Sequence, residues 1–333
     1  GFQSGASRFN VENTVFYQRS VIELCDFFGC AEGELAAEKN KLNAGELFSK
    51  YITAAGIEAV YLDDGFLKEG SRGIKWHSKF VRTKHILRIE TAAEELIEKN
   101  LAFSDFIDAF KDGLKKNAGH IAAFKSVLAY RGGLEYKKAA LKDAKSEYGP
   151  VRGKKIRLSA RSLLCFLLEI AMLAAADAGT AFQFHTGFGD CDLEIHKANP
   201  VCLSNIFNDP IFSKLNIVLL HAGYPYHKEA AWLASVYPNV YIDLGLAVPS
   251  LSNAGIQETL CGITNLCPFN RIIYSSDAHF IPELYYLGAI SARQNLDAFI
   301  KRLVSGREMS IKFAHKAASM ILRENALSIY ENK

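Results

Sequence analysis

The feature that most constrains this chain is a repeated alternation of short apolar segments with longer amphipathic ones. The short segments have the length and the apolar content of strands, whereas the longer ones have helical spacing. Seven strands are predicted, beginning near residues 57, 85, 121, 181, 216, 239 and 271. Because strands that alternate with helices form parallel sheets, the chain is predicted to be an α/β protein.

Polar residues gather where these predicted strands end, which helps to choose between the two common parallel architectures. In a TIM (β/α)8 barrel, the active site lies at the carboxyl ends of the strands. A doubly wound sheet more often carries a Gly-rich phosphate loop after its first strand, and neither GxGxxG nor GxxxxGK[ST] occurs in this sequence. We therefore expect a TIM (β/α)8-type barrel.

Composition and charge exclude several classes of protein. A net charge of +3 is too small to indicate nucleic-acid binding. The longest apolar run, Leu163 to Ala176, spans about 14 residues and contains Glu169, whereas crossing a bilayer takes roughly 20 residues. The seven cysteines form no CxxC pair, which favours reduced thiols and argues against a cysteine zinc site. These features predict a cytoplasmic globular protein.

The chain is expected to form one barrel domain over residues 1–333. Within it we expect an irregular segment at 1–20, a basic excursion between a strand and a helix at 135–157, and C-terminal helices at 296–333. The basic excursion is interpreted as a solvated surface, with a docking surface as the alternative. Clear helical patterns cover 44–55, 103–117 and 158–179, and two separate helices are expected at 282–293 and 296–306.

Three of the predicted strands each deliver a ligand-type residue at the carboxyl end. His185 follows the apolar run AFQF and precedes the glycine-containing turn TGFGD. His221 ends the segment NIVLLH, and Asp277 follows RIIYSS. Taken singly, each residue has an ordinary structural interpretation, namely a hydrogen-bonded strand-end histidine or, for Asp277, a helix N-cap. All three residues stand at the carboxyl end of a strand in its strand–helix unit. Because these ends meet at one edge of a parallel sheet, the three residues are predicted to share one site.

The residue types at this predicted site suit metal-assisted hydrolysis. Neutral imidazoles and a carboxylate are ligands for Zn, Fe or Mn, so His185, His221 and Asp277 are the candidate metal ligands. A metal with an open position binds and acidifies a water molecule. Asp277 can then accept the proton of that water, and His221 can polarise the carbonyl group under attack.

Three basic side chains are candidate substrate ligands. Lys125 ends a predicted strand and can bind a substrate carboxylate or, as a carbamate, bridge two metals, while its alternative is a surface lysine. Arg131 in AYRGG and Arg88 in LRIE can bind an anionic substrate, with an internal ion pair as the alternative for each.

Several long motifs resemble the amidohydrolase-related family (amidohydrolase 2). They are FKSVLAYRGGL, FQFHTGFGDCDLEIHKANP, IVLLHAGYPYHKEAAWLASVYPNVYIDLGLAVPSLSNAG, IIYSSDAHFIPELYYLGAISAR and MILRENALSIY, in this order. The likeness runs from about residue 15 to the C-terminus. It points to the branch that forms the N-terminal part of FluG and of plant nodulin/glutamine synthetase-like proteins.

The resemblance implies a TIM-barrel, metal-dependent hydrolase in which metal-activated water attacks a C–N bond of a small, amide-type molecule. It implies that His185 is a metal ligand, that His221 is a ligand or polarises a carbonyl, and that Asp277 is a ligand and the proton acceptor. Lys125 stands at the position of the family's strand-4 lysine. The expected cofactor is a divalent metal, Zn before Mn or Fe.

The expected partner is a small-molecule substrate rather than nucleic acid or a membrane, and a homo-oligomer is the expected assembly. The chain ends where the glutamine synthetase domain of the fused relatives would begin, so that domain is expected to be absent. These expectations follow from the resemblance and from composition.

One part of the family pattern is missing. The superfamily's first strand carries a His-x-His pair of metal ligands, and this sequence contains no such pair, in agreement with seven predicted strands. Either the sequence is an N-terminally truncated form of a full enzyme, or the site has decayed to leave a non-catalytic binding or scaffold barrel. A decarboxylase-type member of the superfamily is a further alternative. Whether the sequence is truncated or the site has decayed, this chain lacks the His-x-His pair, so we expect weak metal binding and low activity.

Overall fold

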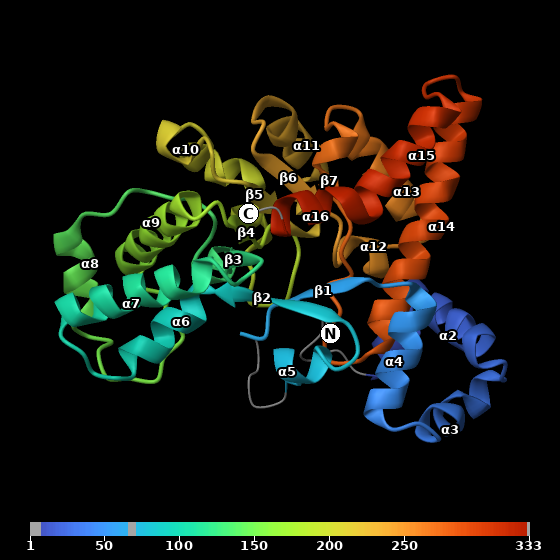
Figure 1. Ribbon diagram of the computed structural model, residues 1–333, viewed down its shortest axis with the longest axis horizontal. Coiled ribbons are helices and arrows are strands. Elements are labelled where there is room, and N and C mark those ends of the chain that lie inside the picture. Colours follow the sequence, from blue (N-terminus) through green and yellow to red (C-terminus); the bar gives the residue numbers. More distant parts are fainter. Residues whose placement is uncertain (1–7, 66–70, 332–333) are drawn as a thin grey trace.

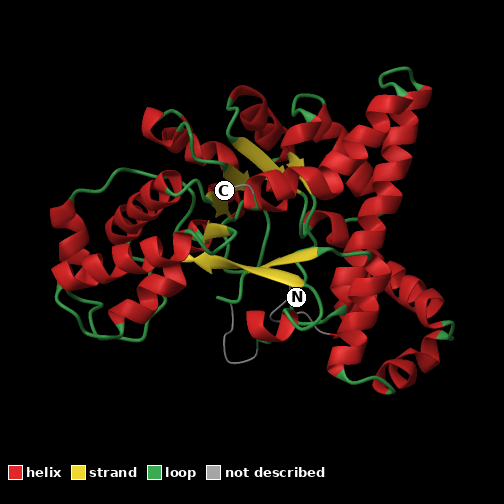
Figure 2. Ribbon diagram, viewed as in Figure 1, coloured by secondary structure: helices red, strands yellow, loops and turns green. Residues whose placement is uncertain are grey.

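The structure, a computed structural model, describes residues 8–65 and 71–331. The described part contains one sheet of seven parallel strands that follow one another in chain order (Figures 1 and 2). The strands are β1 (Ala59–Leu62), β2 (Arg82–Arg88), β3 (Ala123–Ser126), β4 (Ala181–Phe184), β5 (Ile217–Leu219), β6 (Val240–Asp243) and β7 (Ile272–Ile273). This order is the winding of a TIM-type barrel, so the predicted class, architecture and seven strands are confirmed.

Side chains alternate between two faces of the curved sheet. On the interior face, Ile86, Ala123, Ala181, Val218 and Ile273 form one buried cluster. The residues next to them in sequence point outward and pack beneath the helices. Because the alternation has a period of two, it also brings the polar residues near the carboxyl ends of several strands to the interior face.

Helices cover the outer face of the sheet. They are α6 (Ile89–Ile97), α7 (Phe103–Ala118), α8 (Leu141–Tyr148), α9 (Arg161–Asp177), α10 (Ser204–Phe207), α11 (His227–Val236), α12 (Ala247–Ser250) and α13 (Asn253–Thr264), of which α6 to α9 form the group at the left of Figure 1. The apolar helix α9 lies within the helical pattern predicted over 158–179, and most of its apolar side chains are buried. Helix α8 lies within the predicted basic excursion, which is therefore partly helical. No helix in residues 8–65 and 71–331 is both long and apolar enough to cross a bilayer.

A group of helices precedes the sheet, at the lower right of Figure 1. It comprises α1 (Arg8–Glu12), α2 (Val15–Phe28), α3 (Leu35–Asn40) and α4 (Ala44–Ala55), while α5 (Ile74–His77) follows β1. The prediction of an irregular segment at 1–20 is wrong from Arg8 onward, and residues 1–7 lie outside the described part. Helix α2 starts earlier than expected because the Thr14 side chain accepts a hydrogen bond from the Tyr17 amide at 3.1 Å.

The C-terminal region is more continuous than the sequence suggested. Instead of two helices there is one, α14 (Glu283–Ser305), because the Asn295 side chain bonds to the Ser291 carbonyl at 2.9 Å and so fits inside a helix. It is followed by α15 (Ile311–Ser319), a π-helical turn (Met320–Glu324) and α16 (Asn325–Tyr330).

The end of the chain connects the two outer strands of the sheet. In the described part, β1 pairs only with β2, and β7 only with β6. Asn325, in α16, donates to the Ile272 carbonyl of β7 at 2.7 Å. Just beyond α16, Glu331 accepts a hydrogen bond from Tyr61 of β1 at 3.0 Å and pairs with Lys84 of β2. These contacts hold the strands in a curved, barrel-like arrangement.

Candidate active site

The two histidines predicted to share a site are in contact. His185 follows β4 and His221 follows β5, and their side chains are only 5% and 2% exposed. The Nε2 atom of His221 lies 2.9 Å from Nδ1 of His185. Since β4 and β5 are adjacent parallel strands, their carboxyl ends meet at the same rim of the sheet. The structure therefore brings this predicted pair together.

Hydrogen bonds determine which ring nitrogen carries the proton. His221 Nδ1 lies 3.2 Å from the Gly245 carbonyl oxygen, which can only accept, so Nδ1 must be the protonated nitrogen. Nε2 of a neutral His221 is then an acceptor and receives the Nδ1–H of His185. The remaining nitrogen, His185 Nε2, carries a lone pair. It is buried and makes no hydrogen bond of normal geometry among the described residues, although the Phe188 backbone lies close enough to the ring to oppose the lowering of its pKa.

Both imidazoles are neutral near pH 7. Burial lowers the pKa of His185 well below its ordinary value, and the neighbouring His221 lowers it further. Burial also lowers the pKa of His221, to about 4, against the opposing effect of the Asp277 carboxylate. The positive charge of Lys125 also lowers the pKa of both histidines, so this side chain lies within electrostatic reach of the pair. Neutral imidazoles supply the lone pairs that a base or a metal ligand needs.

The backbone takes up a strained conformation at two of the predicted site residues. His221 and Asp277 have φ angles of 64° and 51°, in the left-handed region that non-glycine residues seldom occupy. Such residues cost on the order of 1–3 kcal/mol each and are concentrated at functional sites. Next to His185, Gly187 has a φ of 70°, and a Cβ there would overlap the Tyr224 carbonyl oxygen. These turns fix the direction in which the site residues point.

Asp277 acts electrostatically on one member of the histidine pair, His221. Asp277 follows β7, is half-buried, and its charge also acts on Asp243 and on Tyr130. The helix N-cap interpretation does not hold, because α14 begins only at Glu283 and has Pro282 as its cap. Asp277 is therefore available to the site rather than used by a helix.

A cluster of charges occupies the carboxyl ends of β1, β2 and β3. The Asp63 carboxylate lies 3.0 Å from Lys125 Nζ and 2.5 Å from Arg88 Nη2. Burial would raise the pKa of Asp63, but Lys125 and Arg88 outweigh it and lower the pKa far below the ordinary value. Two of the predicted substrate-binding cations thus lie together at the rim, joined by an acidic residue.

Arg131 does not join this cluster. Its Nη2 donates to Glu94 Oε1 at 3.0 Å, and the same oxygen accepts the Leu158 amide at 2.7 Å. The Arg131 side chain is only 8% exposed. The structure thus favours the internal ion pair over the predicted substrate-binding role, because the guanidinium is directed at α6.

Several residues of the rim were missed from the sequence. Asp63 and Asp243 end strands as His185 does, so the rule that selected the histidine would also have found these carboxylates. Tyr130, whose ring centroid lies 4.6 Å from that of His185, comes from a 3-10 turn after β3 and carries no comparable signal. A Cβ on Gly189 would overlap the Tyr130 hydroxyl and lie 3.1 Å from His185 Nε2, so this glycine allows the close packing.

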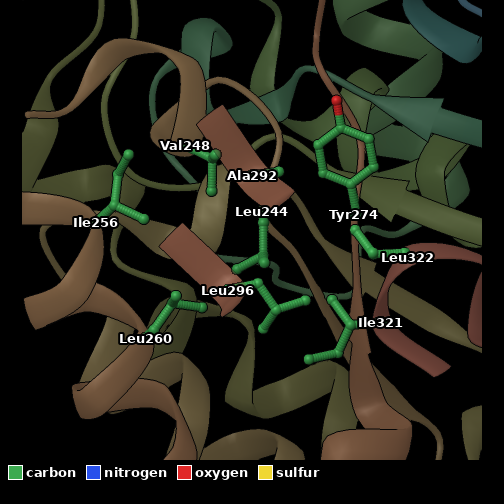
Figure 3. A pocket seen from close by; sticks show the side chains of 9 residues that line it. All are labelled: Leu244, Val248, Ile256, Leu260, Tyr274, Ala292, Leu296, Ile321 and Leu322. Atoms are coloured by element: carbon green, nitrogen blue, oxygen red, sulfur yellow. The ribbon is translucent and has the colours of Figure 1, made fainter. Parts of the chain in front are cut away.

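A separate small cavity lies away from this chemistry. It has a volume of about 10 Å³ and is lined by apolar side chains of the outer core, such as Leu244, Ile256 and Leu296 (Figure 3). Among the side chains drawn there, only Tyr274 carries an oxygen. Because the volume barely admits one water molecule, this is packing space and not a ligand site.

The metal expected from the sequence can be tested against the side chains present. His185 Nε2 is a buried, unpartnered lone pair, which suits a metal ligand in type. Nevertheless, the described residues bring no three His, Cys, Asp or Glu side chains into a group that could hold a metal. Metal sites generally use three or more protein ligands, so these residues supply part of a site and not a complete one.

Comparison with known proteins decides the family. The family model described as Amidohydrolase matches residues 135–331, which include all three predicted ligands. The chain belongs to the amidohydrolase family. The resemblance seen in the motifs is thereby confirmed.

One curated relative of this amidohydrolase is protein FluG of Emericella nidulans, at 28% identity over 318 residues. The match covers 83% of this chain and 36% of FluG, so the chain spans about a third of that relative's length.

Solved structures agree with the fold. A proposed metal-dependent hydrolase from Lactobacillus casei ATCC 334 superposes with a TM-score of 0.88 at 25% identity, covering 98% of this chain and 87% of its own. A uronate isomerase from Thermotoga maritima gives 0.70 at 15% identity, with 97% and 80% covered, and supports the fold alone. The family and its hydrolase neighbour imply an enzyme that uses a divalent metal, while the reaction differs among proteins of this fold.

Proposed function

We propose that this amidohydrolase cleaves a C–N bond in a small anionic amide by attack of water. The observation that carries the proposal is the buried contact between His185 and His221 at the carboxyl rim, with Asp277 and Lys125 within electrostatic reach. The family match and the hydrolase neighbour support hydrolysis over the isomerisation found elsewhere in the fold. The described residues form no complete metal site, so a divalent metal that lowers the pKa of the attacking water would need ligands in addition to His185 and Asp277.

Asp277 is the residue best suited to move the proton. It would accept a proton from the water as the oxygen adds to the amide carbon, and then return it to the leaving nitrogen as the C–N bond breaks. Its carboxylate is half-buried and acts electrostatically on His221. The proton that leaves the water thus ends on the amine product.

His221 takes a different role from the one its sequence suggested. A neutral imidazole has one N–H, and that of His221 is used on the Gly245 carbonyl. In this arrangement His221 has no N–H to donate to a substrate carbonyl. The Nε2 lone pair of His221 already accepts the Nδ1–H of His185, so within the pair it is His185 Nε2 that is suited to holding a metal or a water molecule.

Lys125 supports the anionic character of the proposed substrate. An ammonium has three N–H donors, and the ion pair of Lys125 with Asp63 uses one of them. The side chain ends β3 on the interior face, on the strand next to that of His185. A substrate carboxylate bound there would lie beside the histidine pair.

The test is a screen of the purified chain with Zn, Mn or Fe supplied separately. The substrates are N-acyl amino acids, glutamine-like amides and neutral amides of matched size, and the readout is released amine or ammonia. We expect low but measurable hydrolysis, a preference for anionic amides, and no hydrolysis by His185→Ala.

Equal hydrolysis by His185→Ala would remove this site from the mechanism. No hydrolysis of any substrate with any metal, by protein shown to be folded, would favour the non-catalytic binding barrel. Metal analysis of the same samples checks the expectation of weak binding. About one tightly held metal per chain would contradict it.

A further inference from the structure

We propose that Asp243, Ser275 and the Gly245 peptide act together as a positioning device that sets the tautomers of His221 and His185. None of the three was identified from the sequence as part of the site. The inference concerns which nitrogen of each imidazole carries the proton, and it holds whatever reaction the site performs. Only its consequence for turnover rests on the proposed function.

Asp243 is a buried carboxyl group at the centre of this device. It is the last residue of β6 and is only 3% exposed. Its Oδ1 atom accepts two hydrogen bonds, from the Gly245 amide and from the Ser275 hydroxyl, both at 2.8 Å. The carboxyl group therefore ties the turn after β6 to the segment after β7.

Gly245 links that carboxyl group to the histidines. Its amide donates to Asp243, while its carbonyl oxygen accepts the Nδ1–H of His221 at 3.2 Å. A Cβ at this position would overlap Ser275 Oγ and lie 2.7 Å from Asp243 Oδ1. Only glycine allows the hydroxyl and the carboxylate to approach this closely, so the orientation of the Gly245 carbonyl depends on both neighbours.

The direction of the Gly245 carbonyl fixes the direction of every later hydrogen bond in the series. With His221 protonated on Nδ1, the contact between the two rings requires a proton on His185 Nδ1, which leaves His185 Nε2 as a lone pair. If the carbonyl turned away, His221 could carry its proton on Nε2 and donate to His185 Nδ1. His185 would then be protonated on Nε2 and would lose the buried lone pair that the site offers.

Burying a carboxyl group is costly unless its hydrogen bonds are made. Supporting partners of catalytic or metal-binding histidines commonly fix the tautomer of the ring, and their loss costs about 10–100-fold in activity or metal affinity. Asp243 reaches the ring through a peptide group instead of touching it. It is therefore a positioning residue and not a catalytic one.

The first experiment measures ring ¹⁵N chemical shifts of His185 and His221 by long-range ¹H–¹⁵N NMR, on metal-free protein near pH 7.5. We expect both rings to carry the proton on Nδ1. A proton on Nε2 of either ring in the unmodified protein would overturn the proposal, and this outcome needs no variant to fold.

The second experiment compares Asp243→Ala with Asp243→Asn. Alanine removes the acceptor, so we expect the single tautomer to be lost at both histidines, whereas the asparagine oxygen can still accept both hydrogen bonds and should retain it. The control is Ser126→Ala, which removes a similarly buried hydroxyl-to-carboxyl bond, to Glu90 at 2.6 Å, outside the device. Unchanged tautomers in folded Asp243→Ala would overturn the proposal.

Turnover separates this inference from the proposed function. For a substrate found in the screen, Asp243→Ala should lower kcat about 10–100-fold with little change in KM, and Asp243→Asn should restore most of it. The tautomers can respond as expected while no substrate is hydrolysed. That result would support the positioning role of Asp243 and count against the proposed hydrolase alone.

Discussion

The carboxyl rim of the sheet has two halves that differ in how they hold polar groups. At the ends of β1 to β3, Asp63, Arg88 and Lys125 are charged and held by ion pairs. Beyond β4 and β5, His185 and His221 are neutral, buried and held by directional hydrogen bonds. Both halves lie on the same interior face, separated by one strand spacing between β3 and β4.

The difference shows how one rim can bind and react. Opposite charges a few ångströms apart stabilise each other's ionised forms, so the Asp63 carboxylate stays ionised to low pH. Desolvation, which outweighs the Asp277 charge at His221, lowers the pKa of the imidazoles in the second half and keeps them neutral. We interpret the first half as the place that attracts an anionic substrate and the second as the place where its bond is broken.

The largest expected effect comes from the neutral half. His185→Ala and Asp277→Ala should each lower hydrolysis on the order of 10³-fold or more, because each removes a group that contacts the reacting atoms. The measurement is kcat/KM for the substrate found in the screen, with circular dichroism to show an unchanged fold. His196→Ala, at a mostly exposed position, is the control and should be close to the parent. Retained activity in either site variant removes that residue from the mechanism.

The charged half should instead be most sensitive in stability. Asp63→Asn leaves two buried cations without their shared carboxylate and should lower the free energy of unfolding by about 3 kcal/mol. Asp64→Asn is the matched control, since Asp64 pairs with the partly exposed His85 and should cost less than about 1 kcal/mol. Urea unfolding of both variants makes the comparison. Equal losses would mean that the Asp63 cluster has no special role.

A smaller effect is expected on substrate selectivity. Lys125→Gln should raise KM for an anionic amide about tenfold, which corresponds to about 1.4 kcal/mol, and leave KM for a neutral amide unchanged. Lys84→Gln removes a lysine that pairs with Glu331 and serves as the control. Parallel increases for anionic and neutral substrates would indicate a general disturbance of the site instead of lost anion recognition.

Two buried aspartates of the rim, Asp243 and Asp63, should respond to pH in opposite directions. Burial raises the pKa of Asp243 to about 7, so the folded protein holds a proton that the unfolded chain releases above about pH 4. This contribution to stability is complete below the unfolded pKa and is lost as the pH rises toward 7, by at most about 1.4 kcal/mol per pH unit. Asp63, with its lowered pKa, contributes stability that is lost as the pH falls.

Urea midpoints measured from about pH 2 to about pH 8 test this contrast, because the Asp63 contribution is lost only below about pH 4. Asp243→Asn should remove the loss of stability toward neutral pH, because the amide does not titrate. Asp63→Asn should leave that part of the profile in place. An identical pH profile for Asp243→Asn and the parent would contradict a raised pKa for Asp243.

Much of the fold could be predicted because its signals are local. Seven strands, the apolar helix α9 and the ends of α4 follow from periodicity, with Asn43 and Gly56 capping α4. The errors arose where a local signal was weak or misleading. Thr14 starts α2 inside a segment expected to be irregular, and Asn295 continues α14 where a break was expected.

The site was only partly predictable. His185, His221 and Asp277 were selected because each ends a strand, and the structure brings the two histidines into contact with the aspartate's charge acting on one of them. Arg131 was predicted to bind an anionic substrate, with an internal ion pair as the alternative, and it pairs with Glu94. The partner of a charged residue is set by chain segments distant in sequence, which periodicity does not reveal.

The sequence by itself determined the alternation of strands and helices, and with it the rim at which the polar side chains would meet. This follows because side-chain direction in a strand repeats every two residues and parallel strands share one carboxyl edge. Only the tertiary structure decided which ring nitrogen is protonated, which cations share Asp63, and that Asp243 reaches His221 through Gly245. Those outcomes depend on distances of about 3 Å between residues far apart in the chain, where one hydrogen bond changes the chemistry of the site.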